Sequence, residues 1–439
     1  MSGDKGHKAA AARAAALTRV VGMGFWVQGF RGFPWMGVSY FLMNDLGVAA
    51  SSLQILQNSV NLPMVAKPLY GLLSDAVYIA GQHRLPYVAI GAILQAISWL
   101  AIATLPETYL SIVTLTLFLL LGNLGASIAE VANDAIVAEA GKNSHSPSEY
   151  GQLQSFAWMS TSVGGVLGNL LGGIAISHIS PKTMFLSFVV LLVLQFFMTI
   201  TVSESTLGLP KKISVESKSS SIKKQMSDLR VALCKPAICR SIAWFSTSYA
   251  VIPMLNGTMF FFQTQHLNLD SSIIGISKVF GQAALLAWSV AYNKQFKKFP
   301  AKSVLSILQV AIGLFMVSDV LFVKGIYRDM GITVSIYVVV FSGLLEVLFA
   351  FKMLPFSVLM AQICPVGCEG SVMAFLMSAV ALANIISGYL GVALAASVGV
   401  SGGDFSGFTV GILIQAACAL LPLCWSSWIP DGTREVKED

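Results

Sequence analysis

The chain has 439 residues, of which 55% are hydrophobic and only 11% are charged. Together with a mean hydropathy of +0.74, this composition excludes an ordinary soluble domain. The 27 Lys and Arg outnumber the 21 Asp and Glu and give a net charge of +6. Because these bases gather between apolar runs, the charge indicates membrane topology and predicts no nucleic-acid partner.

Apolar runs of about twenty residues recur along the whole chain, and each is long enough to cross a bilayer. In lipid the backbone must be satisfied within each segment, so such runs are helical. The predicted spans are residues 20–43, 51–74, 86–105, 109–137, 150–178, 183–203, 238–262, 271–293, 301–322, 332–356, 368–397 and 405–428. The sequence therefore predicts an all-α, multi-pass integral membrane protein with twelve transmembrane helices in the lipid bilayer.

The basic residues give the orientation and the domain boundaries. The odd-numbered connections contain only Lys182, Lys324 and Arg328, so both termini are expected on the cytoplasmic side or its equivalent. One long connection, rich in Ser and Lys, separates six spans from six, as a linker between half-domains would. The expected parts are a cytoplasmic N-tail (1–19), a six-helix bundle (20–203), a cytoplasmic linker (204–236), a second six-helix bundle (237–428) and a C-tail (429–439).

The first span carries a charge at an interruption. Gly32 and Pro34 follow Arg31, and broken membrane helices point to a central transport site. Gln28, three residues earlier, shares a helix face with Arg31. A guanidinium at mid-span suits an anionic, planar ligand that forms hydrogen bonds. Alternatively, Arg31 is a buried partner of Glu346 or another acid.

The second span contains Pro63 and Pro68, with Lys67 in its inner third. Ionisable groups in the hydrocarbon region cost about 2.5–3.5 kcal/mol each on insertion scales, so they are seldom kept without a role. Lys67 is thus a candidate partner for an acid or a ligand. Asp75 and Arg84 lie at the inner edge of the membrane, and their position suggests that they serve an inner gate.

The fourth span ends in AEVANDAIVAEA (129–140), which places Glu130 and Asp134 in apolar surroundings. Residues four apart share a helix face, so the two carboxyl groups are neighbours. Two like charges at low dielectric cannot both ionise comfortably. Either a cation such as Lys67 lies close, or one carboxyl holds a proton. The pair then binds substrate or protons, or else it only locks helices together at an inner gate. Glu139 is expected to be solvated beyond the membrane edge.

Later spans add fewer candidates. Lys278 and Asp319 fall in the outer halves of neighbouring spans and are expected to form a structural ion pair, while Lys352 is a further cation within a span. Trp158 on the fifth span could stack on an aromatic ligand, although packing within the bundle explains it better. Stripes of small residues let helices approach closely; they lie on the fifth and eleventh spans, at Gly164, Gly168 and Gly172, and at Ser387, Gly391 and Ala395.

Several functions are not indicated by any motif. The chain has no GxxxxGK[ST] stretch and no HExxH, so nothing predicts ATP hydrolysis or a metal centre. Its six cysteines are too few and too scattered for a disulfide framework or a zinc site. We therefore expect neither an enzyme nor a cofactor or metal.

Five stretches together resemble the folate-biopterin transporter family of the major facilitator superfamily. They are VQGFRGFPWMGVSY (27–40), VAKPLYGLLSDAVYIAGQHRLPY (65–87), AEVANDAIVAEA (129–140), LQSFAWMSTSVGGVLGNLLGG (153–173) and FKMLPFSVLMAQICPVGCEGSVMAFLMS (351–378). The resemblance implies a 6+6 pseudo-symmetric bundle acting as a secondary carrier of folates or pterins by alternating access, proton-linked or exchanging. It also implies a monomer and, since some relatives are found there, the plastid envelope. Relatives often carry several bases where this chain has only Arg84 beside His83, and some have Asp in place of Glu130.

Chemistry agrees with the resemblance. A pterin presents an amino group beside a ring nitrogen, which together match a carboxylate, whereas the glutamate tail of folate needs Arg or Lys. The expected small-molecule site comprises Gln28, Arg31, Lys67, Glu130, Asp134, Trp158 and Lys352. Glu130 and Asp134 are also the candidates for proton coupling. The alternative is a carrier of another aromatic or organic anion.

Overall fold

A computed structural model describes residues 2–142, 147–207, 209, 227, 229–364, 369–400 and 403–430. Throughout this part of the chain the regular elements are helical, apart from isolated bridge residues at Ile79, Gln82 and Asp404. The chain divides into two compact units, Met1–Val38 with Ala66–Lys224, and Ser39–Val65 with Gln225–Asp439.

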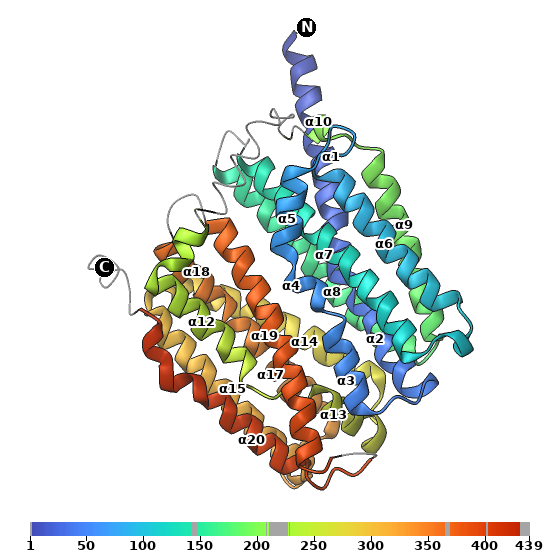
Figure 1. The fold of residues 1–439 in the computed structure, drawn as a ribbon, viewed down its shortest axis with the longest axis vertical. Helices are drawn as coiled ribbons and strands as arrows, with labels where there is room; N and C mark the ends of the chain where they lie inside the picture. The colour runs from blue at the N-terminus through green and yellow to red at the C-terminus, as the bar shows by residue number, and fades with distance from the viewer. Residues whose placement is uncertain are drawn as a thin grey trace. The chain divides into compact units, whose positions relative to one another are not determined.

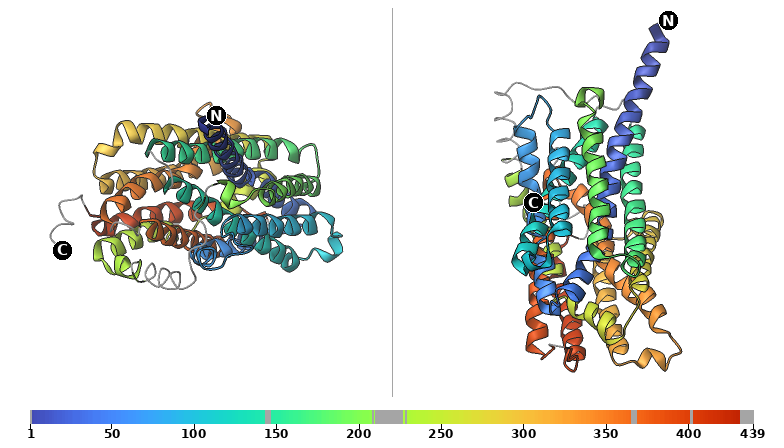
Figure 2. Two further views of the ribbon diagram at one scale, coloured as in Figure 1. Left: turned by 90° about the horizontal axis from the view of Figure 1, so that it is seen from above. Right: turned by 90° about the vertical axis from the view of Figure 1, so that its right-hand side faces the viewer.

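The first unit is built on long helices that pack side by side (Figure 1). Figure 2 shows α1 as one continuous dark-blue helix from the N-terminus. The helices of this unit are α1 (Ser2–Phe30), most of α2 (Gly32–Tyr40), α5 (Lys67–Ala76), α6 (Leu85–Thr104), α7 (Ile112–Lys142), α8 (Pro147–Ile176), α9 (Pro181–Ile200) and α10 (Glu204–Leu207). Its main packing pairs are α6 with α7, α6 with α9, and α1 with α8.

The second unit combines long helices with several short ones. Its α-helices are α3 (Ala50–Ser59), α4 (Leu62–Val65), α12 (Pro236–Ala250), α13 (Asn256–Phe261), α14 (Ser271–Lys294), α15 (Ala301–Val323), α16 (Val334–Tyr337), α17 (Gly343–Phe351), α18 (Met353–Ile363), α19 (Glu369–Ser397) and α20 (Phe408–Leu420). Tighter 3-10 turns lie at Phe296–Lys298, Ile326–Arg328 and Leu421–Trp428, and π-helical turns at Phe41–Asp45, Phe262–His266 and Val338–Ser342. A further 3-10 turn, Glu107–Tyr109, belongs to the first unit.

Nine helices in the described residues are long and apolar enough to cross a membrane. They correspond to predicted spans three to six and eight to twelve. The first span is instead split between α1 and α2, the second among α3, α4 and α5, and the seventh between α12 and α13. These three spans are among those in which the sequence has interrupting Gly or Pro residues.

The breaks follow from the backbone chemistry of proline and glycine. Pro68 lies in the first turn of α5, and Pro355 in the first turn of α18, where an absent N–H costs no helical hydrogen bond. Pro253 lies in the unwound stretch between α12 and α13. Arg31 is itself the residue between α1 and α2, so its charge sits at a helix break.

Small residues bring pairs of helices into backbone contact. A Cβ added to Gly29 on α1 would overlap the Thr161 carbonyl oxygen on α8, and one added to Gly164 would overlap that of Trp26. In the second unit, a Cβ on Gly391 of α19 would overlap the Met254 carbonyl oxygen. The stripes on spans five and eleven therefore pack against spans one and seven, which is the correspondence that a six-plus-six repeat requires.

Residues 39–65 pack with the second unit, whereas the sequence led us to expect them in the first bundle. The buried Gln54 side chain explains the attachment. Its Nε2 donates to the carbonyl oxygens of Met254 (2.6 Å) and Gly388 (2.7 Å), and its Oε1 accepts from the Gly257 N–H (2.8 Å). One amide thus satisfies backbone groups that the break before α13 leaves without helical partners.

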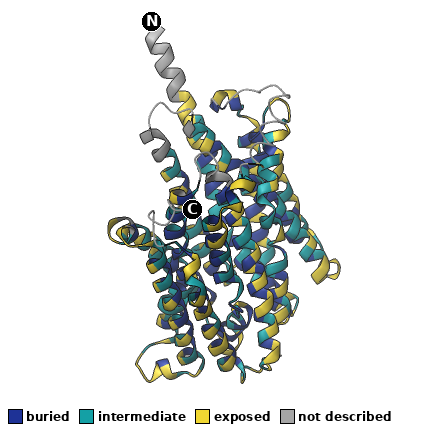
Figure 3. Cartoon of the chain, turned by 60° about the vertical axis from the view of Figure 1, so that its left-hand side comes forward, coloured by how far each residue is buried: buried dark blue, intermediate teal, exposed yellow. Residues whose placement is uncertain are grey.

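Long helices expose apolar residues on their outer faces (yellow in Figure 3). On α15 these residues recur with the period of one helix face, at Ile307, Val310, Leu314, Val317 and Leu321. A stripe of this kind facing water would favour aggregation, whereas facing acyl chains it is satisfied. The exposed faces therefore support membrane embedding.

Candidate functional site

Glu130 on α7 is held between two cations in the first unit. Arg31 Nη1 lies 2.6 Å from its Oε1, and Lys67 Nζ lies 2.6 Å from its Oε2. The carboxylate is buried, but the Arg31 and Lys67 side chains remain 17% and 25% exposed. Arg31, Lys67 and Glu130 together carry one net positive charge, and the two cations stay reachable. Such a cluster can attract an anion.

The helix break positions Arg31 for this role. The guanidinium also donates from Nη2 to Asn123 Oδ1 at 2.6 Å, so it contacts α7 at two points, two turns apart. Lys67 is the first residue of α5 and approaches Glu130 from another break. The prediction of Lys67 as the partner of Glu130 is confirmed. The alternative that Arg31 pairs with Glu346 or another acid also holds, but the acid is Glu130 and not Glu346.

Asp134 differs from its neighbour Glu130. It lies one turn further along α7 and is exposed, and it accepts no hydrogen bond in the part of the chain that the structure describes. The two carboxyl groups therefore have different surroundings, one between two cations and the other open. This difference is what a division of roles between them would need.

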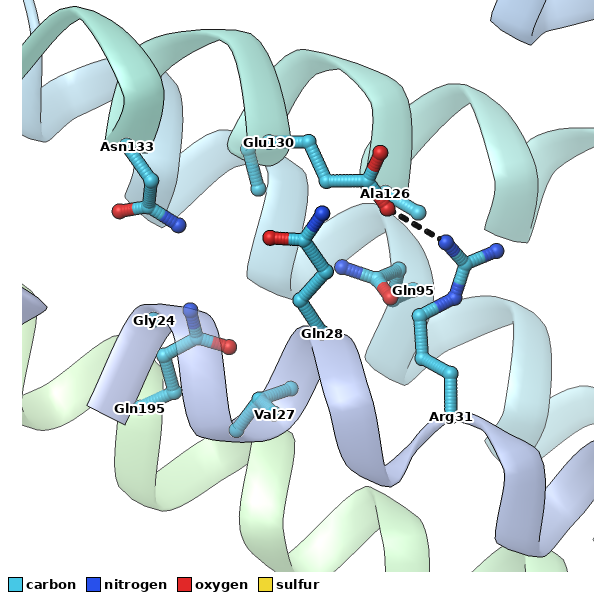
Figure 4. Close-up of a pocket in the computed structure, with 10 residues that line it drawn as sticks. Gly24, Val27, Gln28, Arg31, Gln95, Ala126, Glu130, Asn133 and Gln195 are labelled. Atoms are coloured by element: carbon cyan, nitrogen blue, oxygen red, sulfur yellow. Dashed lines mark hydrogen bonds and ion pairs between the residues drawn. The ribbon is translucent and has the colours of Figure 1, made fainter. Parts of the chain in front are cut away.

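A pocket lined in part by amide side chains adjoins the Arg31–Glu130 pair (Figure 4). Four helices each contribute one amide side chain to its wall: α1, α6, α7 and α9 supply Gln28, Gln95, Asn133 and Gln195. Three of these side chains have a buried carbonyl oxygen without a hydrogen-bond partner in the described structure, namely Gln28, Asn133 and Gln195. Gln28 was expected at the site from the sequence, but the other amides were not, because an uncharged side chain in a span gives little signal.

Lys352 lies in the second unit, at the break between α17 and α18, and is completely buried. Its Nζ donates to Ser248 Oγ (2.9 Å) and Gln309 Oε1 (3.1 Å) and stands 4.0 Å from the centroid of the Tyr249 ring. Dipoles and a cation–π contact replace a counter-ion here. A ligand could reach this ammonium only after these groups moved, so the geometry does not favour Lys352 as a direct substrate contact.

The expected ion pair between Lys278 and Asp319 is wrong. Lys278 Nζ lies 3.9 Å from Glu346 Oε1, while buried Asp319 accepts a hydrogen bond of 3.3 Å from the Tyr337 hydroxyl. Position along a span gives the height of a side chain in the membrane but not the direction in which it points.

Asp75 and Arg84 do pair, within a larger cluster in the first unit. The Arg84 guanidinium contacts the Asp75 carboxylate and also donates from Nη2 to Glu139 Oε1 at 2.6 Å. The expectation that Glu139 is solvated is wrong, since it is largely buried and accepts from Arg84. Burial lowers the pKa of Arg84, but the two carboxylates raise it more, so the guanidinium stays charged.

His83 joins this cluster to the end of α9. Its Nδ1 lies 3.0 Å from Glu204 Oε2 and its Nε2 lies 3.2 Å from Glu139 Oε2. Glu204 also accepts from three successive backbone N–H groups at the start of α6, those of His83, Arg84 and Leu85. Burial lowers the pKa of His83, but the carboxylates raise it more, to about 9.

Glu204 was missed by sequence reasoning because it begins the segment expected to be a solvated linker. Burial raises its pKa, but hydrogen bonds from the His83 ring and from backbone N–H groups outweigh it, so the pKa lies below the usual value. The available signal was an acid directly after an apolar span. It stands where it can meet the unpaired N–H groups of a neighbouring helix.

Trp158 on α8 is 66% exposed, so packing within the bundle does not account for it. In the described residues no group of three or more His, Cys, Asp or Glu could hold a metal ion. The charged residues of the first unit form ion pairs with one another.

Comparison with known proteins now gives the family. Residues 28–439 match the BT1 family. The chain belongs to this family. Its sequence is 57% identical over 419 residues to "Probable folate-biopterin transporter 7" of Arabidopsis thaliana, covering 95% of this chain and 94% of that protein. It is 26% identical over 418 residues to "Folate-biopterin transporter" of Synechocystis sp. (strain ATCC 27184 / PCC 6803 / Kazusa), covering 94% and 82% of the two chains.

Solved structures show the same fold. The D-xylose-proton symporter superposes with a TM-score of 0.67 at 16% identity, covering 95% of this chain and 98% of the symporter. The nucleoside transporter NupG gives a TM-score of 0.69 at 14% identity, with 95% and 98% covered. This BT1 family member therefore has the major facilitator fold. Its family and relatives make it a multi-pass membrane transporter, not an enzyme.

Proposed function

We propose that this BT1 family member is a secondary carrier of folates or related pterins that works by alternating access and is coupled to protons. The observation that carries the proposal is the cluster in which Arg31 and Lys67 share one carboxylate, Glu130. Its excess positive charge, still partly exposed, suits a carboxylated cargo. The names of its relatives, folate-biopterin transporters of a plant and a cyanobacterium, support folates and pterins as the cargo.

Cargo binding and proton transfer are assigned to different carboxyl groups. Glu130 stays ionised between its two cations. One of these cations then forms an ion pair with the anionic part of the cargo. Asp134, exposed one turn away, exchanges the proton. A proton on Asp134 removes the repulsion between the two carboxylates, and its departure restores that repulsion and favours rearrangement. Asp75 and Arg84 form the gate at the inner end.

Transport by purified protein is the direct test. The protein is reconstituted in liposomes, and uptake of labelled folate and of labelled pterins is followed with and without an inward proton gradient. Uptake that rises with the gradient supports the proposal. Efficient uptake of unrelated aromatic carboxylates, with no uptake of folates or pterins, would favour the second candidate, a carrier of another organic anion, because the Arg31–Lys67 cluster would accept any carboxylate.

For the membrane we propose the plastid envelope. Two relatives, 44% and 41% identical, have names that include "chloroplastic", while the name of the relative that is 57% identical does not. A fluorescent fusion of the full chain, expressed in plant cells, would place it at the envelope or at another membrane. We also propose a monomer as the working unit, which cross-linking in native membranes would test.

A further inference from the structure

The pocket beside Glu130 contains hydrogen-bonding capacity that the protein does not use. Asn133 and Gln195 are each 2% exposed, yet the carbonyl oxygen of each has no partner in the described structure. The carbonyl oxygen of Gln28 on α1 is a third such acceptor. Buried acceptors without partners are destabilising and rare in native proteins, so three around one pocket point to a group that satisfies them.

Small residues around the pocket make room for its amide side chains. A Cβ added to Gly24 on α1 would lie 2.6 Å from Asn133 Nδ2, so glycine makes room for this amide. Ala126 and Ala129 give α7 a wall of small side chains. Gln95 completes the ring of amides and donates from its Nε2 to the Gly91 carbonyl oxygen. Figure 4 shows the Gln28 amide close to both Glu130 and Gln95.

We infer that this amide pocket, defined by Gln28, Gln95, Asn133 and Gln195, recognises the N–H-bearing edge of the cargo's heterocycle. The unmet groups are acceptors, so the matching ligand edge must donate. An exocyclic amino group beside a ring N–H provides such an edge, whereas a carboxylate provides only acceptors and would be repelled by the carbonyl oxygens. The anionic part of the same cargo is then bound by Arg31 and Lys67, next to the pocket.

The inference rests on the proposed function for the class of cargo but adds the residues that discriminate within it. The two kinds of contact are separable. Ion pairing by Arg31 and Lys67 attracts many anions, whereas a site built to meet a ligand N–H rejects analogues that lack it, because its buried acceptors then stay unpaired. Selectivity for the ring is thereby assigned to uncharged side chains and affinity for the tail to charged ones.

The test compares three probes on the full-length purified protein. They are pterin, its 2-deamino analogue, and 4-aminobenzoyl glutamate, which has the carboxylates but no pteridine ring. For the parent protein we expect binding of pterin about tenfold tighter than that of the deamino analogue, as one to two hydrogen bonds would give. In Asn133→Leu and in Gln195→Met this preference should disappear, while 4-aminobenzoyl glutamate binds as to the parent. Gln415→Met removes a buried amide of the second unit and should retain the preference.

The outcomes separate this inference from the proposed function. Equal binding of pterin and its deamino analogue by the parent would overturn the inference without any variant. The inference also fails if both pocket variants fold and keep the preference, or if they weaken all three probes equally, which is the signature of a merely structural role. If the parent binds the tail probe but no pteridine at all, the proposed cargo fails as well.

Discussion

In the first unit, Glu130 has a cation on each carboxylate oxygen, whereas in the second unit the ammonium of Lys352 meets only hydroxyl, carbonyl and amide oxygens and aromatic rings among the described residues. The acids differ in the same way. In the first unit, Glu139 and Glu204 belong to an ion-pair network around Arg84 and His83. In the second unit, Asp319 accepts a hydrogen bond from a tyrosine hydroxyl. Charged groups in an ion-pair network can exchange partners during a conformational change, whereas an isolated buried charge can only be hydrogen-bonded or neutralised. We therefore place cargo binding and proton transfer in the first unit.

The largest effect is expected for Glu130→Gln. The substitution keeps the shape of the side chain but leaves Arg31 and Lys67 without their shared anion. Breaking a buried pair from one side typically costs about 3–5 kcal/mol. If about 3 kcal/mol of this cost is added to the free-energy barrier of the transport cycle, the rate of uptake falls about 100-fold. Radiolabel uptake and the unfolding temperature of the purified protein are the measurements. Glu346→Gln, an acid-to-amide change at an exposed pair, is the control, and an equal loss in both variants would contradict the comparison.

Asp134→Asn is expected to affect one mode of transport only. Asparagine carries no proton to exchange, so accumulation driven by a proton gradient should stop. Exchange of external for preloaded substrate should continue, because Glu130 and its cations are unchanged. Counterflow and gradient-driven uptake in the same liposomes separate the two modes. Were both modes lost, Asp134 would have to bind cargo; were both retained, it would have no part in coupling.

Hydropathy and helix-breaking residues predicted the helices of this molecule, but the sequence predicted few of the contacts between side chains. The spans follow from apolar length, and the split of the first and second from Gly and Pro near Arg31 and Pro68. The Glu130–Lys67 pair was predictable because an acid and a base at similar depth in one bundle stabilise each other as an ion pair. These inferences rest on height in the membrane, which sequence position supplies directly.

The predictions that failed depended on how a helix is rotated about its axis or on the path of a connection, and position along a span gives neither. Lys278 and Asp319 lie in the outer halves of neighbouring predicted spans, but their side chains meet different partners, so the expected pairing was wrong. Glu204 was assigned to a solvated linker, although the chain turns there to cover the start of α6. The pocket amides Asn133 and Gln195 were missed since a single uncharged polar residue in an apolar span has many explanations.

A moderate, pH-dependent effect is expected for His83→Gln. Because Glu139 and Glu204 raise the pKa of His83 from 6.5 to about 9, the protonated ring contributes stability fully below pH 6.5. That contribution is lost as pH rises through about 9. We expect on the order of 1–2 kcal/mol, less than the full shift implies, since the site is partly screened. Melting temperatures of the parent should fall between pH 6.5 and 9, and the variant's curve should be flatter there. Parallel curves would show that the first unit's inner network does not depend on the His83 charge.

The smallest effect is expected for Lys352→Met, and it tests the isolated side of the comparison. Methionine has a similar length and no charge, and it can pack against the rings of Tyr249 and Phe349 that now face the ammonium. It gives up the hydrogen bonds to Ser248 and Gln309 but removes the cost of holding a cation away from water. These terms oppose each other, so we expect the free energy of unfolding to change by no more than about 1 kcal/mol and uptake to stay near that of the parent.

Lys67→Met makes the same change where the cation has a carboxylate partner, and it should be clearly more damaging, because Glu130 would lose one of its two cations. Uptake and melting temperature, measured side by side for the two variants, distinguish these cases. If Lys352→Met abolished uptake while the protein stayed folded, the buried lysine would take part in the cycle, and the second unit would share the chemistry assigned here to the first.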